Sequence, residues 1–192
     1  ATTGTASFTP TDDSIYEGNE TGVVAIDSVS GADAAESGSQ SVTITITENE
    51  SAPTVTLATS ATSIAENAGS SLTLTATLSV ATTADVTVGI STSGTGTEGT
   101  DYSTISDITI SAGATTGTAS FTPSDDSIYE GNETGIVAIS TVSGGSATED
   151  GTQSVTITIT ENESAPTVTL ATSATSIAEN AGSSLTLTAT LS

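Results

Sequence analysis

Two stretches of the chain carry the same nine residues, DDSIYEGNE, at 12–20 and at 125–133. Four of the nine are acids, and in the second stretch they are Asp125, Asp126, Glu130 and Glu133. The 192-residue chain contains 23 Asp and Glu but no Lys, Arg or His, which gives a formal net charge of −23. Because no cationic side chain exists to pair with these carboxylates, they repel one another unless a bound cation neutralises them.

Calcium is the cation that these residue types favour. Ca²⁺ binds roughly 6–8 oxygen ligands from carboxylates, carbonyls and water. Transition metals are disfavoured because the chain has neither His nor Cys. Mg²⁺ fits less well because it requires strict octahedral geometry and retains water. The alternative interpretation is a solvated acidic loop that holds no ion, since loops carry acids routinely.

Further acids lie next to the expected ends of strands. Glu66 precedes a Leu-rich segment in SIAENAGSS, and Asp101 follows another apolar segment in GTEGTDYS. Glu161 and Glu163 close a third apolar segment in TENESAP. In a seven-stranded Greek-key sandwich, these positions and the DDSIYEGNE loop are expected to converge on one pole. Glu133 is interpreted either as a ligand of the same site or as a solvated acid.

Apolar residues alternate with threonine in seven segments, which is the pattern of half-buried β-strands. In one of them, Leu72, Leu74 and Leu78 share a face with Ala76. The seven segments span 54–59, 71–79, 85–91, 105–110, 117–122, 133–141 and 154–160. No segment carries a useful helical stripe. We therefore expect an all-β fold, an immunoglobulin-like antiparallel β-sandwich of about seven strands.

The sequence repeats itself with a period of 113 residues, since residues 1–79 laid over 114–192 leave nine mismatches. A period of this length matches a whole small domain rather than a solenoid turn of roughly 20–50 residues. TENESAP interrupts the strand pattern at 47–53 and at 160–166 and predicts the domain borders. Within a long tandem array we expect three parts: the C-terminal part of one unit at 1–51, a complete unit at 52–164 and the N-terminal part of the next at 165–192.

Four motifs of the complete unit, in this order, resemble the Calx-beta domain. They are an acid near a glycine in ENAG at 66–69, GTDY at 99–102, the spaced acids of 125–133 and the acidic close ENE at 161–163. The resemblance implies a seven-stranded immunoglobulin-like sandwich that binds Ca²⁺ at the pole where one domain joins the next. The family's closing stretch is often a run of aspartates, so the Glu-Asn-Glu of this chain leaves the number of bound ions open.

The resemblance also implies a set of metal ligands. The main candidates are Glu66, Asp101, Asp125, Asp126 and Glu130, followed by Glu161 and Glu163, with Glu133 open. The period places equivalent acids in the flanking parts at Asp12, Asp13, Glu17, Glu20, Glu48, Glu50 and Glu179. By contrast, serines replace Asp27 and Asp33 in the second copy. That pair is therefore interpreted as ordinary surface charge.

The resemblance and the repeat together predict a structural, calcium-binding role. We expect a secreted or surface-anchored bacterial adhesin or biofilm fibre, in which Ca²⁺ stiffens the junctions between adjacent repeats of the chain. Two other functions stay open. One is a subunit of a laterally assembled filament or sheath with homotypic contacts. The other is a regulatory calcium sensor, like the similar domains of sodium–calcium exchangers.

Composition excludes several other functions. The acidic surface repels nucleic acid and anionic lipid. No apolar run approaches the roughly 20 residues that cross a bilayer, so we expect no membrane insertion by this segment. We also expect no enzyme, because without His, Lys or Cys no serine or threonine has an evident base.

Overall fold

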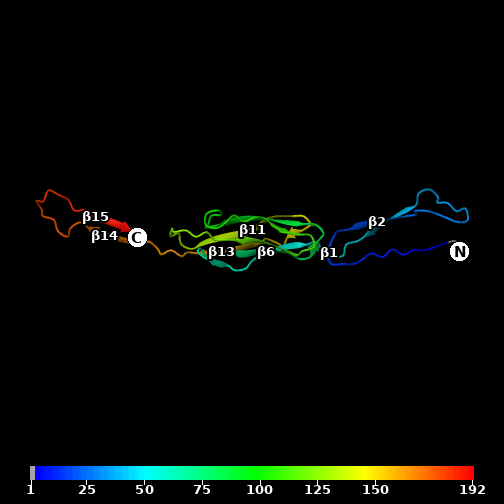
Figure 1. Ribbon diagram of the computed structural model, residues 1–192, viewed down its shortest axis with the longest axis horizontal. Helices are drawn as coiled ribbons and strands as arrows, with labels where there is room; N and C mark the ends of the chain where they lie inside the picture. Colours follow the sequence, from blue (N-terminus) through cyan, green and yellow to red (C-terminus); the bar gives the residue numbers. More distant parts are fainter. Residues whose placement is uncertain (1–2) are drawn as a thin grey trace.

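The computed structural model describes residues 3–192, and in this range the regular secondary structure consists of β-strands (Figure 1). The described part of the chain contains no helix long and apolar enough to cross a membrane. The central strands are β4 (Thr54–Thr59), β5 (Ser63–Ala65), β6 (Leu72–Leu78), β7 (Ala81–Thr82), β8 (Val86–Gly94), β9 (Ile108–Ile110), β10 (Thr116–Phe121), β11 (Glu133–Ser143), β12 (Thr148–Glu149) and β13 (Ser154–Thr160). The flanking strands are β1 (Ile15–Tyr16), β2 (Glu20–Ala25), β3 (Ser41–Ile46), β14 (Val168–Thr172) and β15 (Leu187–Leu191).

Two sheets build the central part of the molecule. One has the strand order β10-β6-β4-β12 and the other the order β5-β13-β11-β8-β9. Neighbouring strands are antiparallel except for two short parallel pairs, β12 with β4 and β5 with β13. The predicted immunoglobulin-like sandwich is confirmed, and each of the seven predicted segments contains a strand. Because β4 and β5 belong to different sheets, the chain crosses between the sheets just before Glu66.

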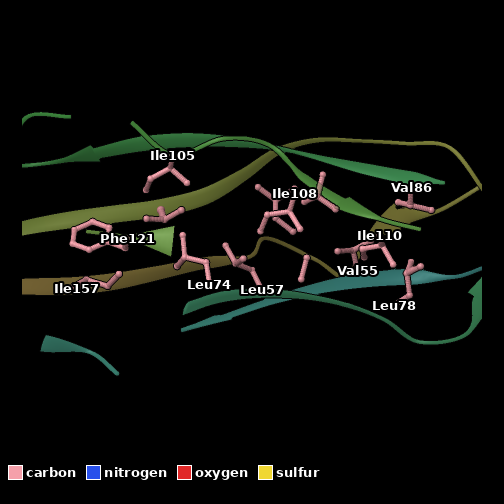
Figure 2. Packing of buried hydrophobic residues seen from close by; sticks show 14 of the residues in the cluster. Val55, Leu57, Leu74, Leu78, Val86, Ile105, Ile108, Ile110, Phe121 and Ile157 are labelled. Carbon is pink, nitrogen blue, oxygen red and sulfur yellow. The ribbon is translucent and has the colours of Figure 1, made fainter. Parts of the chain in front are cut away.

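The apolar side chains of the two sheets meet between the layers (Figure 2). In β6, Leu74, Ala76 and Leu78 are buried, while the intervening Thr75 is half-buried and Thr77 is exposed. The core is almost wholly aliphatic, and burying a Val, Leu or Ile side chain contributes about 1.5–3 kcal/mol. Hydrophobic burial therefore stabilises a domain in which no ion pair between side chains can form.

The flanking parts each form one hairpin, β2 with β3 and β14 with β15. These hairpins expose apolar faces that the central part buries. Leu187 is 68% exposed, whereas Leu74, its equivalent one period earlier, is fully buried. The three parts lie along the long axis of the molecule (Figure 1). A parallel pairing of β1 with β7 joins the N-terminal part to the central one.

Candidate metal centre

Seven carboxylates gather at one end of the sandwich, where β5, β10 and β13 end and β11 begins. Several come from the acidic loop, residues 125–133. Their oxygens form three groups, each with its members within 4.8 Å of one another: Glu66–Glu161–Glu163, Glu66–Asp126–Glu130 and Asp101–Glu130–Glu133. Glu66 and Glu130 each belong to two groups. The three groups are therefore continuous, and we name this set of seven residues the acidic pole.

Glu161 holds the acidic loop in place. Its Oε2 accepts hydrogen bonds from the backbone N–H groups of Glu130 (2.7 Å) and Gly131 (2.8 Å). Its Oε1 accepts from the N–H groups of Asn162 (2.9 Å) and Glu163 (3.0 Å). Backbone hydrogen bonds of this kind, foremost that of Glu163, lower the pKa of Glu161 to about 2. Glu161 is thus a fixed anion that ties the end of β13 to the acidic loop.

A buried aromatic pair positions Asp101. Tyr102 is 1% exposed and stacks on Phe121, with ring centroids 4.6 Å apart. Gly135 of β11 leaves space for this pair, because a Cβ at that position would lie 2.7 Å from Phe121 Cε2. The turn before Tyr102 is closed by a hydrogen bond from the backbone N–H of Thr97 to Asp101 Oδ2 (2.6 Å). The aromatic core therefore fixes the place of Asp101 in the acidic pole.

Glu66 enters the acidic pole directly after β5. Its backbone N–H donates to the carbonyl oxygen of Thr160 (3.0 Å), the last residue of β13, and this places it beside Glu161. Burial, and then the charge of Glu161, raises the pKa of Glu66 to about 7. Without a cation, the acidic pole therefore favours a proton on Glu66.

The other carboxylates of the pole show the same repulsion. Burial, followed by the charge of Asp101, raises the pKa of both Glu130 and Glu133. A hydrogen bond with Glu161, followed by burial, raises the pKa of Glu163. Glu163 Oε2 is buried and has no hydrogen-bond partner within residues 3–192. Since leaving a buried acceptor unpaired costs free energy, a cation fits here, and the all-oxygen donor set suits Ca²⁺.

The residues of the acidic pole lie within a stretch that matches a known family. The family model of the Calx-beta domain matches residues 2–50 and 48–163. The chain belongs to the Calx-beta family. Calx-beta domains bind Ca²⁺, and they are calcium-binding rather than catalytic domains. The family and the chemistry of the donor set therefore agree on the same ion.

Two solved structures are similar to this Calx-beta chain at low sequence identity. The crystal structure of the apo-form Calx CBD1 domain is 16% identical, over 58% of this chain and 99% of that one, with a TM-score of 0.47. The crystal structure of CBD12 from CALX1.2 is also 16% identical, over 55% of this chain and 43% of that one, with a TM-score of 0.46. A search of curated protein sequences found no match.

Seven of the eight acids predicted for the complete Calx-beta unit lie in the acidic pole. The exception is Asp125, a main candidate, which is exposed and belongs to none of the groups found among residues 3–192. Its neighbour Asp126, by contrast, shares a group with Glu66 and Glu130. Asp125 still lies near enough to contribute to the raised pKa of Glu163. Glu133, which the sequence left open, is half-buried beside Asp101.

The N-terminal Calx-beta stretch builds the same loop. Its predicted acids line a cavity of about 280 Å³ and are Asp12, Asp13, Glu17, Glu20, Glu48 and Glu50. Glu48 Oε2 accepts from the N–H groups of Glu17 (2.6 Å) and Gly18 (2.7 Å), and backbone bonds lower its pKa to about 2. In the described chain these acids form no group like those of the acidic pole. Glu179 is exposed and likewise belongs to no such group in residues 3–192.

Sequence reasoning missed two asparagines that support the capping glutamates. Asn132 Oδ1 accepts a hydrogen bond from the N–H of Glu161 (3.0 Å), and Asn19 Oδ1 accepts one from the N–H of Glu48 (2.9 Å). Each asparagine thereby holds the end of a strand, β13 or β3, against the loop that leads into its antiparallel partner, β11 or β2. The sequence signal for these asparagines was that EGNE and TENE both recur in the two copies.

Proposed function

We propose that the chain is a calcium-binding structural repeat of a long extracellular adhesin or surface fibre, in which Ca²⁺ stiffens the junctions between domains. The observation that carries the proposal is the position of the acidic pole. Glu163 belongs to the pole, and β14 of the next part begins shortly afterwards at Val168. An ion held at the pole therefore acts on the segment that links two domains.

A cation at the acidic pole would fix both the domain end and its linker. The residues that would hold it are Glu66, Asp101, Asp126, Glu130, Glu133, Glu161 and Glu163. The ion supplies positive charge that offsets the carboxylate repulsion. Glu163 Oε2, otherwise without a partner in the described chain, would then have one. Without the ion, repulsion at Glu163 acts directly on the linker that starts at Ser164.

Exposed apolar faces in the flanking parts support a tandem array divided at 1–51, 52–164 and 165–192. The residues of β14 and β15 repeat those of β4 and β6, whose apolar side chains the central part buries. In the C-terminal hairpin the equivalents of these buried residues are 67–72% exposed: Val168, Leu170, Leu187 and Leu191. A complete unit would cover them with its second sheet. Adjacent repeats of the same chain are thus the partners that we propose.

An extracellular location suits the chemistry of the pole. Extracellular calcium modules typically bind with dissociation constants of about 10⁻⁴–10⁻³ M, which matches calcium levels outside cells. A chain with a net charge of −23 also stays soluble through self-repulsion. We therefore place the array in a secreted or cell-surface protein, where calcium is constantly available to its junctions.

Small-angle X-ray scattering of the 192-residue chain tests the proposal. Millimolar calcium is expected to lengthen the particle and to reduce its flexibility relative to chelator. The double substitution Asp126→Asn with Glu130→Gln should abolish this response, because both residues belong to the pole. The matched control is Asp150→Asn, an exposed acid outside the pole, which should leave the response intact. Identical scattering profiles in calcium and in chelator would refute the stiffening role.

A further inference from the structure

An apolar pair in the N-terminal acidic loop contacts the following domain. Ile15 and Tyr16 form β1, which pairs in parallel with β7, so that Ile15 lies opposite Ala81 and Tyr16 opposite Thr82. Both side chains of the pair are half-buried in this junction. Within residues 3–192, this is the only strand pairing between the N-terminal part and the sandwich.

The equivalent pair one period later, Ile128 and Tyr129, has no strand partner in the described part of the chain. Ile128 is 62% exposed and Tyr129 is 45% exposed. The first copy of this dipeptide makes a strand contact with the next domain, so the exposed second copy presents the same contact surface. The same dipeptide is thus covered in one junction and open at the other.

Carboxylates hold both dipeptides in the same way. Asp13 Oδ1 accepts a hydrogen bond from the N–H of Ile15 (2.8 Å), and Asp126 Oδ1 accepts one from the N–H of Ile128 (2.6 Å). On the other side, the capping glutamates accept from the next two N–H groups in both copies. The open pair is therefore pre-organised, and little conformational entropy is lost when a partner strand arrives.

The edge that receives the pair is also rigid. Thr82 is 1% exposed, its Oγ1 donates to the carbonyl oxygen of Ala84 (2.7 Å) and its own carbonyl oxygen accepts from the N–H of Gly113 (2.8 Å). Gly145 packs so closely that a Cβ on it would lie 2.8 Å from Thr82 Oγ1. Both members of the pairing are thus fixed by their own domains before they meet.

We propose that the Ile-Tyr pair of the acidic loop is the docking strand of the inter-domain joint, and that Ile128–Tyr129 takes the Ala-Thr edge of a following repeat. The proposal rests on the proposed function, because it identifies the contact that joins the calcium-stiffened units. A cavity of about 450 Å³ lies at the open pair and is also lined by Leu191 and Ser192. These two residues are the equivalents of Leu78 and Ser79, from which only Val80 separates β7 in the closed junction. The 113-residue period would therefore bring the next Ala-Thr edge to this cavity.

The same loop serves calcium and the joint. Asp126 and Glu130 belong to the acidic pole and flank the open dipeptide on either side. An ion bound at the pole restrains both flanks and thereby the strand between them. Calcium binding and docking are thus coupled through a single loop.

Spin-label distance measurements across the closed junction test the proposal. The chain has no cysteine, so Thr43→Cys and Thr109→Cys, both at exposed positions, give two unique labels. In calcium we expect a single narrow distance distribution. The double substitution Ile15→Ser with Tyr16→Ser should broaden it about twofold, as a flexible linker takes over. The same substitutions at Ile128 and Tyr129 are the matched control and should leave this junction unchanged.

A second chain, extended after Ser192 by a copy of residues 80–164, completes the next unit and creates a second junction. At that junction the roles of the two pairs of substitutions are exchanged. There, with labels in the central and the added unit, serines at Ile128 and Tyr129 should broaden the distribution. If the serine substitutions change neither junction while calcium binding persists, the docking proposal is wrong and the calcium proposal stands. If docking is lost on substitution but the distributions at the second junction, where the acidic pole lies, are the same in calcium and in chelator, the docking proposal stands and calcium stiffening is wrong.

Discussion

The substitution Glu66→Gln is expected to change the stability of the domain in opposite directions with and without calcium. Glu66 belongs to two of the three carboxylate groups of the acidic pole, so its loss affects two of the three places where the pole could hold calcium. Burial, and then the charge of Glu161, raises the pKa of the Glu66 carboxyl group to about 7, so its ionised form is unfavourable in the fold. Glutamine keeps the shape of the side chain and removes the charge.

In chelator at pH 8, Glu66→Gln should stabilise the domain. A carboxyl group whose folded-state pKa is raised from 4.5 to about 7 destabilises the fold whenever it is ionised. Because solvent screens this half-buried group, we discount the corresponding free energy to about 1 kcal/mol. A gain of this size raises the melting temperature of a domain of about 100 residues by roughly 5 °C.

In calcium the same substitution should destabilise the domain. A site with a dissociation constant of ~10⁻⁴ M stabilises the fold by about 2.7 kcal/mol at a hundredfold excess of calcium. If losing one shared ligand weakens binding about 100-fold, the remaining stabilisation is about 0.4 kcal/mol. After the gain of about 1 kcal/mol from the removed charge, the variant is about 1 kcal/mol less stable than the parent.

Differential scanning calorimetry measures the change of melting temperature in chelator and in about 10 mM calcium. The calcium concentration is then about a hundredfold above the dissociation constant. Asp150→Asn is the matched control, because it also removes one negative charge but lies outside the acidic pole. The control should shift both melts by the same small amount. If Glu66→Gln moves the melting temperature in the same direction in both conditions, the assignment of Glu66 as a shared ligand is refuted.

The remaining predictions concern the ligands, the pH response and the packing of the pole. Asp126→Asn should weaken calcium binding far more than Asp107→Asn in isothermal titration calorimetry, and equal effects would contradict the ligand set. Without calcium, the melting temperature should rise as the pH falls from 8 to about 5, because the raised pKa of Glu66 lets the folded state take up the proton first; a flat profile would contradict this. It should then fall between pH 4.5 and about 2, because the lowered pKa of Glu161 keeps that group charged only while the fold persists, and an unchanged melt would contradict the capping bonds. Gly135→Ala should destabilise the domain by about 1–3 kcal/mol in denaturant unfolding, because its Cβ would lie 2.7 Å from Phe121 Cε2; a neutral result would show that the ring moves freely.

The strands could be predicted because alternation is a local property. Each strand has one face against the core and one toward solvent, so the pattern of Leu74, Ala76 and Leu78 with threonines between them is visible without any knowledge of the partner strand. The acidic pole could be predicted because acids next to strand ends must lie at an end of the sandwich. Order along the chain and knowledge of the fold class were enough to bring them to one end.

The finer geometry of the site could not be predicted in this way. Whether Asp125 or Asp126 faces Glu66 depends on the exact rotation of the loop, which two adjacent identical residues do not reveal. The capping by Glu161 joins residues about 30 positions apart through backbone N–H groups, and these have no sequence signature. The docking strand was missed for a related reason, because Ile15 and Tyr16 show their partner only when a second domain is present.

The range over which the charges act explains why a bound ion rather than salt can control such a junction. At physiological ionic strength the Debye length is about 8 Å, so charges on separate domains hardly affect one another. The oxygens within each group of the acidic pole lie within 4.8 Å of one another, well inside that length, and mobile salt screens them poorly. Repulsion is thus concentrated at the acidic pole. It acts on the acidic loop, which carries Ile128 and Tyr129, and on Glu163, which precedes the linker. Under the proposed function, calcium bound there would reduce the repulsion at the point where it acts on the linker, and a chain without any basic residue could then have an ordered joint.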